Sequence, residues 1–474
     1  MKRSLAFVLA AFALAGCVSA PSTTPSETAL KPATLGLGAA PLPHIDDTWW
    51  KSFDDPQLDA LVERALAGSP TLAVALARLH EAQSQLAAST AATYPQITAD
   101  GNETRERFSK NYIIPPPFGG TTQWIGTVQA NLSWSLDLFG KEQDQVDRAR
   151  ATADAAALDA TAARLLLAGS VTRSYIALAR AWVLVDVARD AADERAGVLS
   201  LTAGRVRAGL DTMASQKQAE ALLAIAREDL IRAQSDRDIA VHQVAALIGR
   251  GADAYDIKRP RLSETALPLP DVLPADLLSR RADIAAAQAR IEAAVSGREV
   301  ARKAFYPDVN LLGLAGWAAV GLAPMLSASS LQYGAGAAIH LPIFDAGKLR
   351  AEYAGATAGL DEAVADYNRT VVEAVRETAD AATELRAVQD QGVQARTALD
   401  AAQASFDLAA RRYRSGLDPQ QHVLDTQATL IQARRQYAAL SSDTEAARVA
   451  LLMAAGGGFE PAKDSTPSQD VSHE

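Results

Sequence analysis

Cysteine is almost absent from this chain of 474 residues, in which Cys17 is the only one. A single cysteine cannot form a disulfide within the chain, so disulfides contribute nothing to this fold. Aromatic residues make up only 5% of the sequence, and alanine dominates its long segments. This composition favours extended helices over a thick globular core.

Signatures of catalysis and of metal binding are also missing. The six histidines are scattered without the spacing of metal ligands. There is no Gly-x-Ser-x-Gly motif and no phosphate loop, and residues 249–251 lack the rest of a dinucleotide fingerprint. We therefore expect a protein that is not an enzyme, with no catalytic residue, no metal site and no cofactor other than a covalent lipid.

Positive charge and long apolar runs are scarce too. The chain has 46 basic and 56 acidic residues, for a net charge of −10, whereas nucleic-acid-binding proteins carry a basic footprint. A membrane-spanning helix is a rival interpretation of residues 311–326, but this run is shorter than the ~20 residues required. The counterpart of this run earlier in the chain is polar, so we expect a strand at 311–326. From the acidic net charge we expect no nucleic-acid partner.

The N-terminus resembles a bacterial lipoprotein signal. Lys2 and Arg3 precede an apolar run at 5–15, which is too short to span a bilayer. The sequence LAGC at 14–17 resembles a lipobox, in which the cysteine is acylated and becomes the first residue. We predict a signal peptide at 1–16 and lipidation of Cys17, with an ordinary signal peptide as the alternative. No aspartate follows Cys17, which favours the outer membrane over retention at the inner one.

The remainder of the chain is a duplicated domain between two tails. Residues 59–97 return as 271–309, and the sequence RAGLD at 207–211 returns as RSGLD at 414–418. Copies of about two hundred residues far exceed the ~20–50 of solenoid repeats. We place a lipidated tether at 17–48, repeat 1 at 49–255, repeat 2 at 256–455 and a disordered tail at 456–474.

Each repeat is predicted to hold a β-hairpin, at about 95–139 and about 307–344. Residues 127–139 alternate strictly between apolar and polar side chains, which is the period of a strand. Their number suits the ~9–11 residues of a tilted strand that crosses a bilayer. Four such strands cannot close a barrel, and open edges are not tolerated in lipid. Three chains that pool their strands would have 12 strands, enough to close a barrel. A barrel of this kind, continued by the long helices that follow the strands, would be a conduit.

Each hairpin is followed by a long helical hairpin, at about 141–249 and about 346–453. Residues 141–205 contain no proline and would form a rod of ~100 Å. At the sharp turns, Gly209 and Gly416 suit the left-handed position that ends a helix. Asp211 and Asp418 suit the N-cap of each returning helix, with Pro419 at its first position.

Four motifs carry a resemblance to TolC-like outer-membrane efflux proteins that extends over nearly the whole mature chain. They are WWKSFDDPQL at 49–58, LFGK at 138–141, LPADLLSRRADI at 273–284 and LPIFDAGK at 341–348. The family usually has proline where Ala282 stands, which concerns only a helix start. With the lipobox, the resemblance points to the lipoprotein branch that serves resistance–nodulation–division (RND) pumps.

The resemblance implies a mainly α fold with a membrane β-barrel portion. Three chains would form a 12-stranded outer-membrane barrel continuous with an α-helical periplasmic tunnel. The implied partners are two further copies of the chain, outer-membrane lipid, a periplasmic adaptor and an inner-membrane RND pump. The implied function is a passive exit duct for small molecules. A periplasmic scaffold lipoprotein and a duct for protein secretion remain as alternatives.

The resemblance also implies roles for residues near the two turns. The turns themselves would form the periplasmic tip where the adaptor docks, and an exposed leucine in each supports this, because capping does not require one. Just past them, lumen-facing side chains would form a tunnel constriction, and arginines before them could tether the closed tip. The docking residues are Gly209, Leu210, Asp211, Gly416, Leu417 and Asp418, and the constriction residues are Ser215, Gln218, His422, Asp425, Arg207 and Arg414. Ordinary turns and a solvated polar helix face are the alternative interpretations.

Overall fold

The computed structural model describes residues 23–30, 35, 45–111, 113–251, 256–262, 279–321 and 323–460. The predicted signal peptide, Cys17, most of the tether, the tail beyond 460 and the motif residues 273–278 lie outside these ranges. The chain divides into two compact units. We call them the sheet unit (Met1–Ala29, Arg78–Ala156, Ala286–Asn368) and the turn unit (Leu30–Ala77, Ala157–Ala285, Arg369–Glu474).

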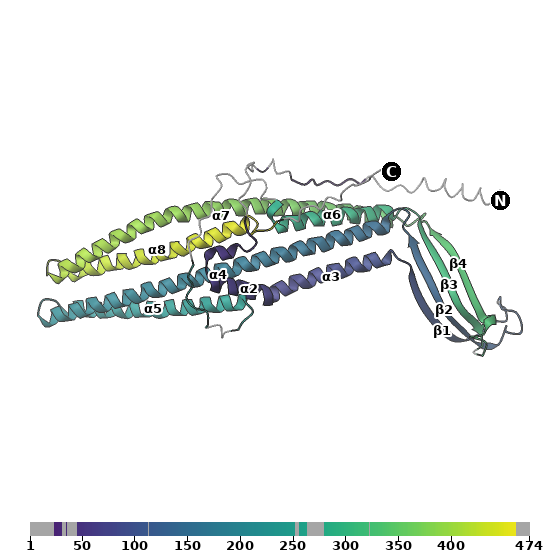
Figure 1. The fold of residues 1–474 in the computed structure, drawn as a ribbon, viewed down its shortest axis with the longest axis horizontal. Coiled ribbons are helices and arrows are strands. Elements are labelled where there is room, and N and C mark those ends of the chain that lie inside the picture. Colours follow the sequence, from purple (N-terminus) through teal and green to yellow (C-terminus); the bar gives the residue numbers. More distant parts are fainter. Residues whose placement is uncertain are drawn as a thin grey trace, which may run out of the picture. The chain divides into compact units, whose positions relative to one another are not determined.

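The sheet unit contains one antiparallel sheet of four strands in the order β1-β2-β3-β4 (Figure 1). Its strands are β1 (Gln96–Arg107), β2 (Thr122–Leu136), β3 (Asp308–Val320) and β4 (Leu331–His340). Both predicted β-hairpins are therefore confirmed, although β2 begins five residues before the strictly alternating segment. The run at 311–326 forms most of β3 rather than a helix, as expected.

The register of the strands collects apolar side chains on one face of the sheet. Leu132 of β2 lies opposite Ile97 of β1 and Gly313 of β3, and directly paired residues share a face. Along β1 this face is apolar only as far as Gly101, beyond which Glu103, Arg105 and Arg107 lie on it. We take the apolar residues on this face at 97–101, 128–136, 309–317 and 331–339 as one set. We call this set the apolar sheet face: Ile97, Ala99, Gly101, Val128, Ala130, Leu132, Trp134, Leu136, Val309, Leu311, Gly313, Ala315, Trp317, Leu331, Tyr333, Ala335, Ala337 and Ile339. Within the chain, much of it is exposed, with Tyr333 at 81% and Ile97 at 74%.

Two helical hairpins follow the two β-hairpins along the chain. Helices α4 (Lys141–Arg207) and α7 (Lys348–Arg414) each have 67 residues, about 100 Å at the helical rise. They return through α5 (Met213–Leu247) and α8 (Gln420–Ala454), each of 35 residues. Identical lengths in both copies agree with the duplication, and the predicted ends are correct to within two residues.

Shorter helices precede each β-hairpin: α2 (Pro56–Gly68) and α3 (Pro70–Ala92) in repeat 1, and α6 (Ala282–Lys303) in repeat 2. Across the described ranges, no single helix is long and apolar enough to cross a membrane. The bent pair α2 and α3 meets that test of length and composition when taken together.

The main core of the turn unit forms where the segment at 49–58 packs between the long helices. Trp49, Trp50 and Phe53 of a 3-10 helix are buried there, with Leu58 of α2 fully buried beside them. The carboxylate of Asp55, 6% exposed, accepts hydrogen bonds from the Tyr175 hydroxyl at 2.8 Å and from two backbone N–H groups. A buried carboxylate is tolerated only when it is bonded in this way, so this segment fastens the start of the chain to the helices.

We predict that Leu58→Ala lowers the free energy of unfolding by about 2–5 kcal/mol, because it leaves a cavity in this core. Arg64→Ala on the exposed side of the same helix is the matched control and should change stability by less than about 0.5 kcal/mol. Thermal unfolding followed by circular dichroism would measure both. Equal melting temperatures for the two variants would contradict the assignment of this core.

Candidate functional site

The two turns of the turn unit are built alike and end in an exposed leucine. Gly209 and Gly416 adopt left-handed backbone angles, with φ of +71° and +73°, as the sequence predicts. The N–H of Leu210 donates to the carbonyl of Arg205, and that of Leu417 to Arg412, both at 2.9 Å. Each leucine side chain is 66% exposed. The turn geometry therefore holds both leucines away from the helix cores.

The aspartates of the turns are not the helix caps that the sequence suggests. The N-cap of α5 is Thr212, whose hydroxyl accepts from the N–H of Ser215 at 3.1 Å. The N-cap of α8 is Pro419, which has no capping side chain and stands one position before the helix rather than at its first residue. The prediction for Asp211 and Asp418 was wrong because other side chains engage both carboxylates.

Asp211 joins the first turn to the second helical hairpin. The hydroxyl of Tyr413, near the end of α7, donates to Asp211 Oδ2 at 2.8 Å. Arg205 Nε lies 3.7 Å from the same oxygen, and its guanidinium stacks 4.6 Å from the centre of the Tyr413 ring. Arg205 also donates to the carbonyls of Tyr413 at 3.2 Å and Leu210 at 3.3 Å. We call Arg205, Asp211 and Tyr413 the tip triad.

The ionisation of the tip triad suits these bonds. Burial raises the pKa of the Asp211 carboxyl, but hydrogen bonds from Ser215, Thr212 and Tyr413 outweigh it. Together with the positive charge of Arg205, they hold this pKa below its ordinary value. Burial and the neighbouring carboxylate raise the pKa of Tyr413, which is 1% exposed. At neutral pH the tyrosine is therefore a donor and the aspartate an ionised acceptor.

A second link lies beside the triad. Gln420, at the start of α8, donates through Nε2 to the Thr202 hydroxyl at 2.9 Å and to the Ser215 carbonyl at 3.2 Å. The Thr202 and Tyr413 hydroxyls are 3.3 Å apart, which connects the two links. Around them lies a small apolar cluster of Val198, Ala409, Val423 and Leu424. The two helical hairpins are thus locked together next to the turns.

In the second turn, Asp418 bonds within its own hairpin. Arg412 Nε donates to Asp418 Oδ2 at 2.9 Å, and His422 Nδ1 lies 3.0 Å from the same oxygen. The hydrogen bond with Arg412, aided by His422, lowers the pKa of the Asp418 carboxyl. Asp418 therefore stabilises its own turn, whereas Asp211 bridges two hairpins.

Four predicted constriction residues, Ser215, Gln218, His422 and Asp425, lie just past the turns, and the last three are exposed in the single chain. Gln421 donates to Asp425 Oδ1 at 2.7 Å, and Gln218 donates to Gln421 at 3.2 Å, so the two copies meet here too. Arg207 donates to the carbonyl of Ala203 at 3.4 Å. The role of Arg207, Arg414 and the other predicted constriction residues stays a prediction.

Sequence reasoning missed Tyr413, Gln420 and Arg205. One signal could have found the first two: they are differences between the copies. At the 207-residue offset that relates the turns, Tyr413 corresponds to Val206 and Gln420 to Met213. Repeat 2 therefore supplies both side chains that reach across to repeat 1, and their counterparts in repeat 1 do not form hydrogen bonds of this kind.

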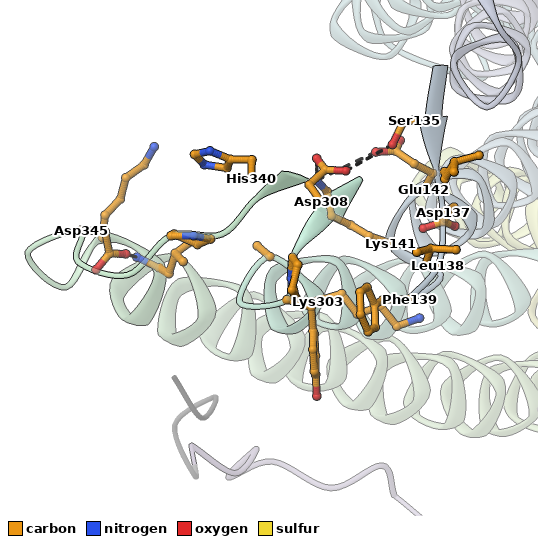
Figure 2. A pocket seen from close by; sticks show the side chains of 17 residues that line it. Ser135, Asp137, Leu138, Phe139, Lys141, Glu142, Lys303, Asp308, His340 and Asp345 are labelled. Atoms are coloured by element: carbon orange, nitrogen blue, oxygen red, sulfur yellow. Dashed lines mark hydrogen bonds and ion pairs between the residues drawn. The ribbon is translucent and has the colours of Figure 1, made fainter. Parts of the chain in front are cut away.

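A separate pocket lies in the sheet unit, where the strands end and α4 and α7 begin (Figure 2). Several of its charged groups take part in hydrogen bonds or ion pairs. Asp308 accepts from the Ser135 hydroxyl at 3.3 Å and lies 3.6 Å from Lys141 Nζ. Lys303 Nζ lies 2.7 Å from Asp144 Oδ2. These contacts join β2 to β3, β3 to α4, and α6 to α4, which is a structural role. Among the residues described, no group of His, Cys, Asp or Glu is placed to hold a metal ion.

Both repeats match one known protein family, and proteins similar to this chain match it over most of its length. The family described as outer membrane efflux protein matches residues 61–250 and 273–457, once in each repeat. Fusaric acid resistance protein FusA of Burkholderia cepacia is 33% identical over 485 residues, covering 99% of this chain and 91% of the relative. The putative multidrug resistance outer membrane protein MdtQ of Escherichia coli (strain K12) is 29% identical over 460 residues, with coverages of 94% and 96%. The crystal structure of the outer membrane protein VceC from Vibrio cholerae is similar with a TM-score of 0.83 and 32% identity, over 88% of this chain and all of that chain.

The lowered pKa of Asp211 makes the tip triad sensitive to acid. A carboxylate of this kind stabilises the fold fully above its unfolded pKa of about 3.9, and that contribution is lost as the pH falls through the folded value. We predict that Asp211→Asn melts below wild type by about 1–2 °C at pH 7, and that the difference disappears as the pH falls below about 4. Melting curves between pH 7 and 3 would test this, with Asp425→Asn as control. A difference that is independent of pH would refute the ionic role of Asp211.

Proposed function

The chain belongs to the outer membrane efflux protein family, and from this premise we propose that it is the exit duct of a tripartite efflux system. In this proposal, small molecules such as drugs and toxic compounds leave the cell through three assembled copies. An inner-membrane RND pump supplies the energy, and a periplasmic adaptor connects it to the duct. The observation that carries the proposal is the lock between the two helical hairpins at the turns, since a duct needs a closed resting state.

The sheet supports assembly into a trimer. Each of β1 and β4 has one neighbouring strand among the described residues, so each leaves one edge open. Lipid offers no hydrogen bonds to such an edge, and barrels of outer membranes start at about eight strands. Three copies of four strands, with β4 of one copy beside β1 of the next, give a closed barrel of 12. The apolar sheet face then contacts lipid, a surface for which a periplasmic scaffold would have no use.

The N-terminal segment supports attachment to the same membrane. We propose that Cys17 is acylated and holds the mature chain at the outer membrane. A single acyl chain binds membranes only weakly, and stable anchoring takes more than one hydrophobic signal. The lipid and the apolar sheet face together meet that condition.

In the resting duct, the tip triad holds the end of the tunnel closed. The Tyr413–Asp211 bond and the Gln420–Thr202 bond both run from repeat 2 to repeat 1. Opening must break both. The Tyr413–Asp211 bond has a charged acceptor and contributes about 1.5–3 kcal/mol, whereas the neutral Gln420–Thr202 bond contributes about 0.5–1.5 kcal/mol. Ser215, Gln218, His422 and Asp425 lie next to this lock and are our candidates for the narrowest part of the lumen.

We predict that Tyr413→Phe opens the duct. The substitution keeps the ring and removes the hydroxyl that holds Asp211, so the closed state should lose about 1.5 kcal/mol, or roughly tenfold in the closed-to-open ratio. Conductance of the purified trimer in planar bilayers measures this. Tyr437→Phe, in α8 away from the turns, is the control and should behave as wild type.

Two results of that experiment would count against the proposal. Equal conductance for Tyr413→Phe and Tyr437→Phe would remove the triad as the lock. No conductance in any variant, including Tyr413→Phe combined with Asp425→Ala, would favour the scaffold lipoprotein over the duct.

The exposed leucines are the proposed contact with the adaptor. We predict that Leu210→Ser combined with Leu417→Ser abolishes drug export but leaves trimers intact, because these side chains are 66% exposed and contribute little to the fold. The conservative pair Leu210→Met and Leu417→Met should retain export. Drug susceptibility of cells and native gels would measure the two effects. Unchanged susceptibility of the serine variant would exclude docking through these residues.

A further inference from the structure

Residues 23–30 form an extended strap whose backbone is bound by one carboxylate of α7. Asp361 Oδ1 accepts from the N–H of Ser26 at 2.8 Å and from the N–H of Glu27 at 3.0 Å. Asp361 Oδ2 accepts from the Ser26 hydroxyl at 2.9 Å. Both carboxylate oxygens are therefore used, and two successive N–H groups are bound at once. Ser26, Glu27 and Asp361 all belong to the sheet unit.

Two further side chains fix the ends of this strap. Arg298 of α6 donates to the carbonyl of Thr23 at 3.0 Å and to the Thr357 hydroxyl at 3.2 Å, and it stacks over the Tyr353 ring at 5.0 Å. At the other end, Asn368 donates to the carbonyl of Thr28 at 3.0 Å. The contacts follow the sequence order of both partners, so the strap runs alongside α7 in the same direction as the helix.

The residues that bind Thr23, Ser26, Glu27 and Thr28 all belong to repeat 2. Of these, Arg298 and Asn368 correspond to Leu86 and Thr161 of repeat 1. Asp361 corresponds to Asp154, which is an exposed residue of α4. Repeat 1 therefore has the equivalent carboxylate, Asp154, but lacks equivalents of Arg298 and Asn368. A substitution of Asp154 can serve as the control for a substitution of Asp361.

We propose that the Asp361 surface of α7 is a docking site for residues 23–30, and that the docked strap sets the reach of the lipid anchor. This rests on the acylation of Cys17 proposed above. Hydrogen bonds from Glu27 and Ser26 hold the pKa of Asp361 below its ordinary value, so the carboxylate is ionised and its bonds are charge-assisted. Pro25, directly before Ser26, limits the backbone freedom that docking must remove.

The lengths are consistent with this role. Only five residues separate Cys17 from Thr23, so the anchor lies within about 20 Å of the point where Arg298 binds the strap. Thr357, at that point, is nine residues into α7, or about 14 Å from the helix start. This span is long enough for the anchor of a docked strap to reach the level where α7 begins, at the end of the sheet. Without docking, the chain between Cys17 and Ile45 imposes no such limit, and the anchor and the sheet can enter the bilayer independently.

Hydrogen exchange measured by mass spectrometry on the lipidated, full-length trimer in detergent tests the docking. In wild type, the amides of Ser26 and Glu27 should exchange slowly. Asp361→Ala should accelerate their exchange by about tenfold or more, because both N–H groups lose their acceptor, whereas Asp154→Ala should have no effect. Equal exchange in these two variants would overturn the docking site. This measurement does not depend on whether the channel conducts.

Membrane insertion tests the consequence. The yield of outer-membrane trimer should fall severalfold in Asp361→Ala and stay unchanged in Asp154→Ala. In a Cys17→Ser background, which has no anchor to position, Asp361→Ala should cause no additional loss. An equal loss with and without Cys17 would show that Asp361 acts on folding alone and would overturn the positioning role, as would a normal yield of Asp361→Ala.

Discussion

An unpaired strand edge in lipid costs several kcal/mol for each backbone group that lacks a partner, and the sheet formed by the described strands has two open edges. The four strands form one sheet whose register places sixteen apolar side chains and two glycines on a single face. A sheet of this kind is stable in a membrane only when other copies of the chain close it. The other properties that we propose all depend on assembly with further copies of the chain. In the proposed duct, the helical hairpins of three chains together enclose the lumen.

Duplication provides similar building blocks, but the functional contacts lie where the copies differ. Tyr413 and Gln420 reach from repeat 2 to repeat 1, and their counterparts Val206 and Met213 have no side chain for those bonds. The N-terminal strap also binds repeat 2, through Asp361. Repeat 2 thus supplies the tyrosine and the glutamine that bond to repeat 1 near the turns, and also the carboxylate that binds the N-terminal segment.

Most of the fold could be predicted from the sequence because its signals are local. Alternation between apolar and polar residues marks β2, and Gly209 and Gly416 mark the turns through their backbone angles. The beginning of β2 was missed because Trp124, Ile125 and Gly126 break the alternation, and pairing with β1 extends the strand through them.

The contacts of the tip triad could not be predicted from local sequence signals. The partner of Asp211 is Tyr413, which follows 202 residues later in the chain. A turn that contains Gly-Leu-Asp suggests a helix cap on local grounds, and only the packing of two hairpins brings a tyrosine hydroxyl to the carboxylate. The strap is another long-range contact, since Ser26 and Asp361 are 335 residues apart.

The equal length of α4 and α7, 67 residues each, has a consequence for how this sequence can evolve. Removing one residue from either helix turns everything beyond it by about 100° and shortens it by about 1.5 Å. Tyr413 would then point away from Asp211, and the two turns would end at different heights. Insertions and deletions within these helices are therefore tolerated only when both copies change together, whereas the loops between strands are free to vary one at a time.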